Sequence, residues 1–177
     1  MPASPAHEFT RRVLLARIGP QPFRQQIEAS ESERAALARR FDLESLASLS
    51  ARVEIAPRGR EMFLLKADFA AEFAQTCSIT LEPVPGAVEG HFELIYGPPE
   101  AEETVAGAGV EDDLAFEPLT GDSIDIGEAV AQEFSLALPE FPRAPGADLE
   151  AEMPPQPDEV NPFTALAALR GRYATKS

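Results

Sequence analysis

The sequence is poor in the residues that form covalent cross-links or metal sites. It has one cysteine, Cys77, and two histidines, His7 and His91, in 177 residues. One cysteine excludes an internal disulfide, and the two histidines, 84 positions apart, cannot complete a Cys/His zinc cluster with it unless other ligands join. We therefore expect no metal site and no cofactor.

Long apolar runs are also missing. No window approaches the roughly 18 consecutive apolar residues that a membrane helix needs, and the start, MPASPAHEFTRR, lacks the apolar core of a signal peptide. We expect a cytoplasmic protein that makes no membrane contact. The hydrophobic content of 44% is enough for a globular core, and the length suits one domain with tails.

Signatures of common enzymes are absent. The chain has no dinucleotide-binding glycine motif after a strand, no Walker loop and no Gly-x-Ser-x-Gly nucleophile elbow. Cys77 lies between Thr76 and Ser78 in an acidic region, which favours a raised thiol pKa and a buried cysteine in a strand. His7 and His91 are expected to face solvent. The sequence therefore predicts no catalytic residues and no enzymatic activity.

Basic residues are almost absent from the middle of the chain. Residues 71–160 carry 1 basic and 21 acidic side chains, whereas residues 1–70 carry 11 and 9, and residues 161–177 carry 3 and none. The middle segment repels nucleic-acid phosphates, because phosphate binding needs clustered Lys and Arg. Within it, Glu111, Asp112 and Asp113 lack the spacing of a calcium loop and are expected to form a solvated acidic run.

What is present indicates an α+β fold. Strands are predicted at 9–18, 46–56, 61–81 and 88–96, with a bulge or bend near Ala70 and Ala71 and a hairpin turn at Pro83 to Gly86. Helices are predicted at 31–41, where Ser30 and Glu33 have capping-box spacing, and at 126–137, where Asp125 is the N-cap. The strands form an antiparallel, twisted sheet, open or barrel-like, with the 9–18 strand at an edge and the two helices over its open face.

The domain organisation follows from composition. Residues 1–138 are expected to form a single α+β domain that includes a mobile acidic loop at 97–123. Residues 139–160 are predicted to be an acidic, proline-rich arm, and residues 161–171 a short helix. Phe163, Leu166 and Leu169 give that helix an apolar stripe, which would pack on its own sheet or on a partner.

Three segments resemble the YceD family, described as large ribosomal RNA subunit accumulation proteins. They are QTCSITLEPV (75–84), DSIDIGEAVAQEFSLALPEFPRAP (122–145) and NPFTALAALR (161–170), in the family's order and spacing over roughly residues 46–170. The resemblance implies a bacterial cytoplasmic factor for accumulation of large-subunit ribosomal RNA, with no established enzymatic activity. Many relatives carry Cys-x-x-Cys at the first segment. Here Ser78, Ile79 and Thr80 follow Cys77, so metal binding does not carry over.

Two routes to that function are open from the sequence. In the first, the acidic face contacts the basic tails of ribosomal proteins or large-subunit assembly intermediates. Its candidate partner-binding residues are Phe163, Leu166, Leu169, Glu111, Asp112 and Asp113. In the second, the protein binds RNA directly through the basic N-terminal portion, with candidate contacts at Arg11, Arg12, Arg39, Arg40, Arg58 and Arg60. We expect a monomer in either case.

Overall fold

The computed structural model describes residues 8–59, 61–101 and 114–147. The described residues up to Ala144 belong to one compact unit. Residues 145–147 begin a second unit, Pro145–Ser177. The predicted C-terminal helix, with Phe163, Leu166 and Leu169, lies outside the described residues, as do Glu111, Asp112, Asp113 and Arg60.

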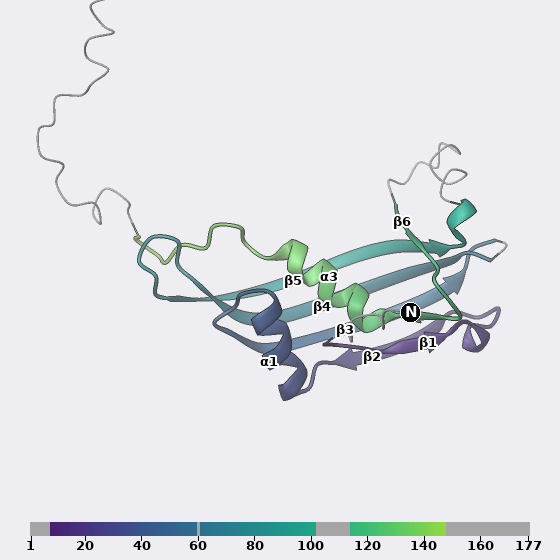
Figure 1. The fold of residues 1–177 in the computed structure, drawn as a ribbon, viewed down its shortest axis with the longest axis horizontal. Helices are drawn as coiled ribbons and strands as arrows, with labels where there is room; N and C mark the ends of the chain where they lie inside the picture. The colour runs from purple at the N-terminus through teal and green to yellow at the C-terminus, as the bar shows by residue number, and fades with distance from the viewer. Residues whose placement is uncertain (1–7, 60, 102–113, 148–177) are drawn as a thin grey trace, which may run out of the picture. The chain divides into compact units, whose positions relative to one another are not determined.

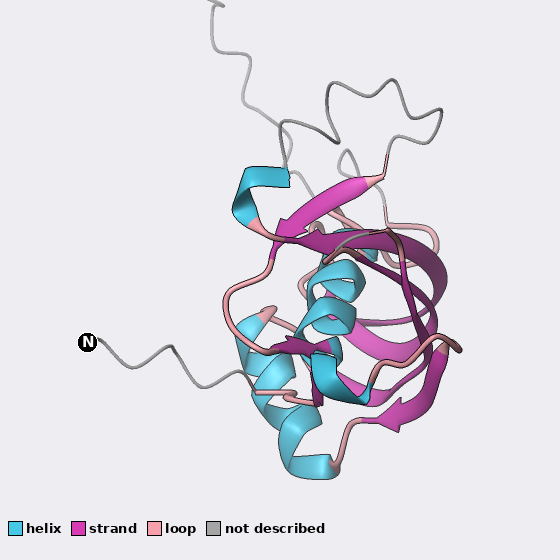
Figure 2. Ribbon diagram, turned by 90° about the vertical axis from the view of Figure 1, so that its right-hand side faces the viewer, coloured by secondary structure: helices cyan, strands magenta, loops and turns pink. Residues whose placement is uncertain are grey.

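A five-stranded sheet with the order β2-β3-β4-β5-β6 forms the centre of the fold (Figure 1). Its first four strands are antiparallel neighbours, and β6 pairs parallel to the end of β5. The sheet curves without closing into a barrel (Figure 2). Its edge strands are β2 and β6. The strands are β2 (Phe23–Glu28), β3 (Ser45–Pro57), β4 (Phe63–Thr76), β5 (Pro83–Gly97) and β6 (Ala115–Pro118).

Two helices confirm the capping signals of the sequence. Helix α1 (Glu31–Arg40) begins with the complete capping box of Ser30 and Glu33. Helix α3 (Ile126–Ala137) begins at Asp125, whose carboxylate accepts hydrogen bonds from the N–H groups of Gly127 and Glu128. Short 3₁₀ turns η1 (Leu15–Arg17) and η2 (Pro99–Ala101) complete the helical elements of the described ranges.

The helices cover one face of the sheet, which we call the inner face (Figures 1 and 2). Alternate residues of β3 and β4 are buried there, because the strand pleat sends every second side chain to the same side. Phe134 of α3 is fully buried, and its ring lies 5.7 Å from that of Phe73 in β4 and 5.9 Å from that of Phe41. The opposite, outer face carries mostly polar side chains.

The edge of the sheet differs from the prediction. The expected strand 9–18 is reduced to β1 (Arg12–Leu14), which pairs with β7 (Ser123–Asp125) in a separate two-stranded sheet. The edge position belongs to β2, which the sequence analysis missed. Only Phe23 and Ile27 of β2 are shielded from solvent, so its apolar pattern is weak. Its pairing with β3 is what defines it as a strand.

The β4–β5 hairpin also turns earlier than predicted. The turn spans residues 77–82, and the Pro-Val-Pro-Gly segment lies inside β5, where Pro83 pairs with Thr76 and Pro85 with Ala74. The register shift lies in β3, between Leu46 and Ser48, and not near Ala70 and Ala71 of β4. Part of the predicted loop 97–123 forms β6 and β7, and its residues 102–113 lie outside the described residues.

The N-terminal segment crosses the start of α3 so closely that only glycine fits there. The carboxylate of Asp125 accepts a hydrogen bond from the N–H of Arg11, and the N–H of Ile126 donates to the carbonyl oxygen of Arg11. A Cβ atom added to Gly127 would overlap the carbonyl oxygen of Phe9 and lie 3.0 Å from the nitrogen of Arg11. This crossing holds residues 9–14 against α3 and β7, so they do not pair into the five-stranded sheet.

We expect Gly127→Ala to lower the free energy of unfolding by about 1 to 3 kcal/mol, because backbone must move to admit the methyl group. Urea denaturation measures the loss. The matched control is Gly19→Ala, since nothing lies within 4 Å of a Cβ added at Gly19. Equal stability of the two variants would contradict the close crossing.

Candidate functional site

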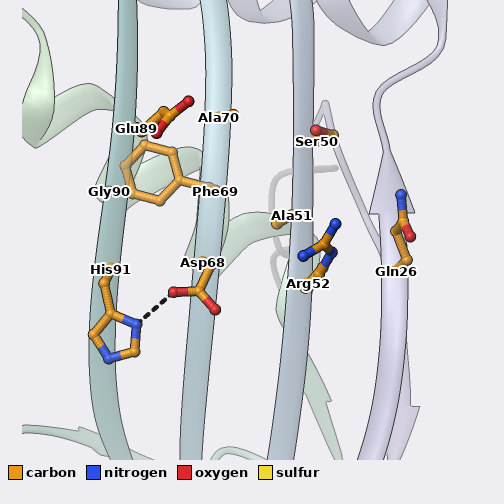
Figure 3. Close-up of a pocket in the computed structure, with 10 residues that line it drawn as sticks. All are labelled: Gln26, Ser50, Ala51, Arg52, Asp68, Phe69, Ala70, Glu89, Gly90 and His91. Atoms are coloured by element: carbon orange, nitrogen blue, oxygen red, sulfur yellow. Dashed lines mark hydrogen bonds and ion pairs between the residues drawn. The ribbon is translucent and has the colours of Figure 1, made fainter.

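The outer face of the sheet is organised in rows that run across the strands. One row joins Gln26, Arg52, Asp68 and His91 from β2, β3, β4 and β5, each opposite the next in register. The neighbouring row has the small residues Ser50 and Ala70 at its centre, between Glu28 and Glu89. These two rows border an open hollow of about 550 Å³ (Figure 3).

A third row consists of paired charges. Arg24 of β2 contacts Glu54 of β3 at 2.7 Å, and Lys66 of β4 contacts Glu93 of β5 at 2.5 Å. Lys66 lowers the pKa of Glu93 by donating a hydrogen bond to its carboxylate. Exposed pairs of this kind each contribute about 0 to 1 kcal/mol. In each pair, the cation and the carboxylate neutralise each other.

His91 of β5 lines the hollow and lies beside two carboxylates. Its Nδ1 lies 2.8 Å from the Asp68 carboxylate, and its Nε2 lies 3.5 Å from that of Glu93 (Figure 3). The hydrogen bond to Asp68 raises the pKa of His91, with Glu93 adding to the effect. The His91 side chain is 53% exposed, as the sequence predicted for a solvent-facing histidine. The arrangement can donate and accept hydrogen bonds with a polar partner.

We expect an NMR titration to place the pKa of His91 above 6.5, the value of an unperturbed histidine. The raised pKa means that the protonated imidazole stabilises the fold fully below pH 6.5 and that this contribution disappears as the pH rises through the raised value. Asp68→Asn should lower the pKa, whereas Glu89→Gln, on the same face but outside the pair, should change it less. A wild-type pKa at or below 6.5 would contradict the pairing.

Two arginines named as RNA contacts are engaged in bidentate ion pairs. Arg11 contacts both carboxylate oxygens of Glu33, at 2.6 and 2.9 Å, and also donates to the carbonyl oxygens of Thr10 and Glu28. The hydrogen bond from Arg11 lowers the pKa of Glu33 to about 2. This pair connects the N-terminal segment to the first turn of α1.

The second pair connects the two helices. Arg40, in the last turn of α1, contacts both carboxylate oxygens of Glu128 at 2.8 and 2.7 Å, and it contacts Glu8 at 3.0 Å. Glu128 is buried, and the hydrogen bonds that Arg40 donates to its carboxylate raise the pKa of Arg40. Glu128 lies three positions after the N-cap Asp125, which is the spacing of a capping box, but its carboxylate contacts Arg40 of α1. Arg11 and Arg40 thus serve the fold.

Breaking the Arg40–Glu128 pair should leave a buried carboxylate without its main cation. We expect Arg40→Ala to lower the free energy of unfolding by about 2 to 4 kcal/mol in urea denaturation. The neighbouring Arg39→Ala, which removes an exposed arginine, should stay within about 0.5 kcal/mol of wild type. If both substitutions cost the same, the ion pair is not a structural link.

The remaining RNA-contact candidates of the described part do not gather at one place. Arg12 is exposed and lies 4.0 Å from Asp125, Arg39 is exposed at the end of α1, and Arg58 is half-buried in the β3–β4 turn. The assignments of all the candidate residues stay predictions: Arg11, Arg12, Arg39, Arg40, Arg58, Arg60, Glu111, Asp112, Asp113, Phe163, Leu166 and Leu169.

Cys77 corrects two expectations. It is fully buried, but it lies in the β4–β5 turn and not in a strand. Hydrogen bonding from Thr80, and then the N–H groups of Ala144 and Ile79, lowers the pKa of the thiol, where the sequence analysis expected a raised value. These donors come from the turn and from the segment after α3, so they are visible only in the tertiary structure. The sulfur is an internal acceptor that ties the two segments together.

The sheet turns the charge pattern of the sequence into a pattern in space. Because neighbouring strands follow chain order, β5, β6 and α3 all come from the stretch between Lys66 and Arg143, which contains no Lys or Arg. We call β5, β6 and α3 the acidic side. Exposed Glu89 and Glu117 belong to it, as does Glu133, whose pKa is raised by burial and by the charge of Glu117. The sequence analysis saw the acidic segment but not that it supplies the neighbouring strands β5 and β6 and a helix packed against β4 and β5.

A family model described as "Large ribosomal RNA subunit accumulation protein YceD" matches residues 65–170. The match covers β4 from Leu65 onward and all of β5, β6 and α3, and therefore the whole acidic side. No curated protein and no solved structure matches the chain. Within the described ranges, no helix is long and apolar enough to cross a membrane.

Proposed function

The chain belongs to the YceD family, and from this premise we propose that it supports the accumulation of large-subunit ribosomal RNA by contacting basic proteins through its acidic side. The family name itself implies a role in the accumulation of this RNA. It describes an accumulation factor and names no reaction. Contact with proteins is the part of the proposal that the charge distribution supports.

The observation that carries the protein-contact route is the segregation of charge across the sheet. The acidic side has no Lys or Arg, and the pKa of Glu133 is raised by burial and then by the charge of Glu117. Such a surface attracts basic segments over long range and accelerates their encounter, and it repels RNA phosphates. Basic tails of ribosomal proteins, or of intermediates that contain them, have the complementary charge.

Direct RNA binding is the competing route, and the ion pairs weaken it. Phosphate binding needs guanidinium groups that can face the ligand, but Arg11 and Arg40 each hold a carboxylate of the chain itself in a two-point contact. Exposed Arg12 and Arg39 are the cations that this route would use first.

A deletion strain tests the function, with the ratio of large- to small-subunit ribosomal RNA as the readout. We expect the ratio to fall on deletion and to return with the wild-type gene. The combined variant Glu89→Gln, Glu117→Gln, Glu133→Gln should restore it poorly, because attraction for basic partners is lost. The matched variant Arg12→Ala, Arg39→Ala, Arg58→Ala removes the same number of charges and should restore it fully.

The outcomes separate the routes. An unchanged ratio on deletion overturns the proposed function altogether. Failure of the arginine variant, together with a gel shift of ribosomal RNA that weakens steeply with salt, would favour direct RNA binding. Melting temperatures of both variants establish that each one is folded.

A further inference from the structure

Strand β5 has an open edge on the acidic side. It pairs with β4 along its whole length, from Pro83 to Gly97, but β6 covers only Leu94 to Gly97 on its other side. Over residues 83–93, no described strand lies beside this edge, and Figure 1 shows β6 next to one end of β5 only. Unpaired strand edges present rows of N–H and C=O groups to which another strand can pair.

The direction of the peptide groups follows from the pairing at the end of the strand. The carbonyl oxygen of Gly97 accepts a hydrogen bond from the N–H of Leu119, just after β6. The backbone N–H and C=O groups of Gly97 therefore point away from β4. Peptide groups alternate along a strand, and the β4–β5 register is continuous. Those of Ala87, Glu89 and His91 therefore point to the open edge as well.

The two prolines of β5 agree with this direction. Pro85 and Pro83 lie two and four positions before Ala87, so their backbone groups face the same side of the strand as those of Ala87. The N–H groups that the prolines lack would therefore have pointed to the open edge and not to β4. Prolines are a common means of blocking an edge strand. They block only the beginning of this edge, and from Ala87 onward the residues that face it have N–H groups.

The side chains at the open edge select for positive charge. Glu89 is exposed, and no hydrogen bond or ion pair engages its carboxylate among the described residues. β5 contains no Lys or Arg, and Glu93 lies on the same face as Glu89. A second copy of this chain would bring the same carboxylates, on a protein of net charge −15, against them. A basic strand has complementary charge.

We propose that the edge of β5 at Ala87–Glu93 binds an extended, lysine- or arginine-rich segment of a partner protein as an added strand. Main-chain hydrogen bonds to Ala87, Glu89 and His91 hold the segment, and the carboxylates of the acidic side select its charge. This inference rests on the proposed function and names the surface at which the basic partner binds. Residues on the outer face of the added strand extend the rows of Glu89 and His91.

The test uses the full chain and a peptide of alternating lysine and threonine with uncharged, capped termini. Threonine is chosen because it favours strands. The control peptide has proline in place of every threonine, which keeps the charge and removes half of the N–H donors. We expect the first peptide to bind at least about tenfold more tightly than the second. We expect the amides of Ala87, Glu89 and His91 to exchange fast in the free protein and to exchange more slowly once the first peptide is bound.

Two variants at one position isolate the edge. Ala87→Pro places a third proline at a position whose N–H faces the open edge, as at Pro83 and Pro85. It therefore removes a donor from the open edge without removing a hydrogen bond to β4. Ala87→Val keeps the donor and adds comparable bulk. We expect Ala87→Pro to lose at least about tenfold in affinity for the lysine–threonine peptide and Ala87→Val to retain it, with both variants folded by thermal melting.

Several results would overturn the inference. Equal binding of the two peptides means that the surface attracts charge without adding a strand, and absence of binding by either peptide rejects the site. Slow exchange of the three amides before any peptide is added means that another part of the chain or a second copy already occupies the edge. Binding of an RNA oligonucleotide with protection of these amides assigns the edge to nucleic acid.

The deletion strain keeps this inference separate from the proposed function. If wild type restores the ribosomal RNA ratio and Ala87→Pro restores it equally well, the edge is not the partner site, and the proposed function stands. If wild type itself does not restore the ratio, the proposed function fails whatever the peptides do.

Discussion

The register of the central strand β4 is the constraint on which the rest of the structure depends. β4 pairs with β3 and β5 over nearly its full length, and the pleat separates its side chains into two sets. Leu65, Phe69 and Phe73 face the helices, whereas Lys66 and Asp68 face outward. A slip of one residue would exchange the two sets and place charges beneath α3. The buried ring of Phe134 against Phe73 therefore stabilises the same register that forms the outer rows.

Ion pairs then decide which charges remain available to partners. Arg11 and Arg40 come from the basic part of the chain, and their two-point contacts with Glu33 and Glu128 join the N-terminal segment to α1 and α1 to α3. Such pairs combine geometry with charge, which suits the planar guanidinium group. Both guanidinium groups already contact carboxylates of the chain itself, and β5 and β6 contain no Lys or Arg. Each pair neutralises one carboxylate together with one cation, so the charge asymmetry of the fold is the one already present in the sequence.

Cys77 shows how a reactive residue type can have a structural role. Its sulfur accepts hydrogen bonds from the β4–β5 turn and from Ala144, and the N–H and hydroxyl groups of Ser78 donate to the carbonyl oxygen of Pro142. These contacts fix the segment after α3 against the turn. The sequence analysis assigned that segment to the proline-rich arm, because composition reports proline and charge but not the acceptors that a distant turn supplies.

The sequence by itself determined the elements whose signals are local. The capping residues Ser30 and Asp125 placed both helices to within about a residue, and the period-two pattern placed β3 to the same precision, because a cap or a pleat involves neighbours in the chain. Tertiary structure alone decided what depends on distant partners. The polar strand β2 exists because β3 lies beside it. β1 pairs with β7 where Arg11, just before β1, bonds to the start of α3, and the carboxylates that engage Arg11 and Arg40 come from other elements. The open edge of β5 is of this second kind, since whether a strand is an edge depends on which strands pair beside it, and no pattern within β5 encodes that.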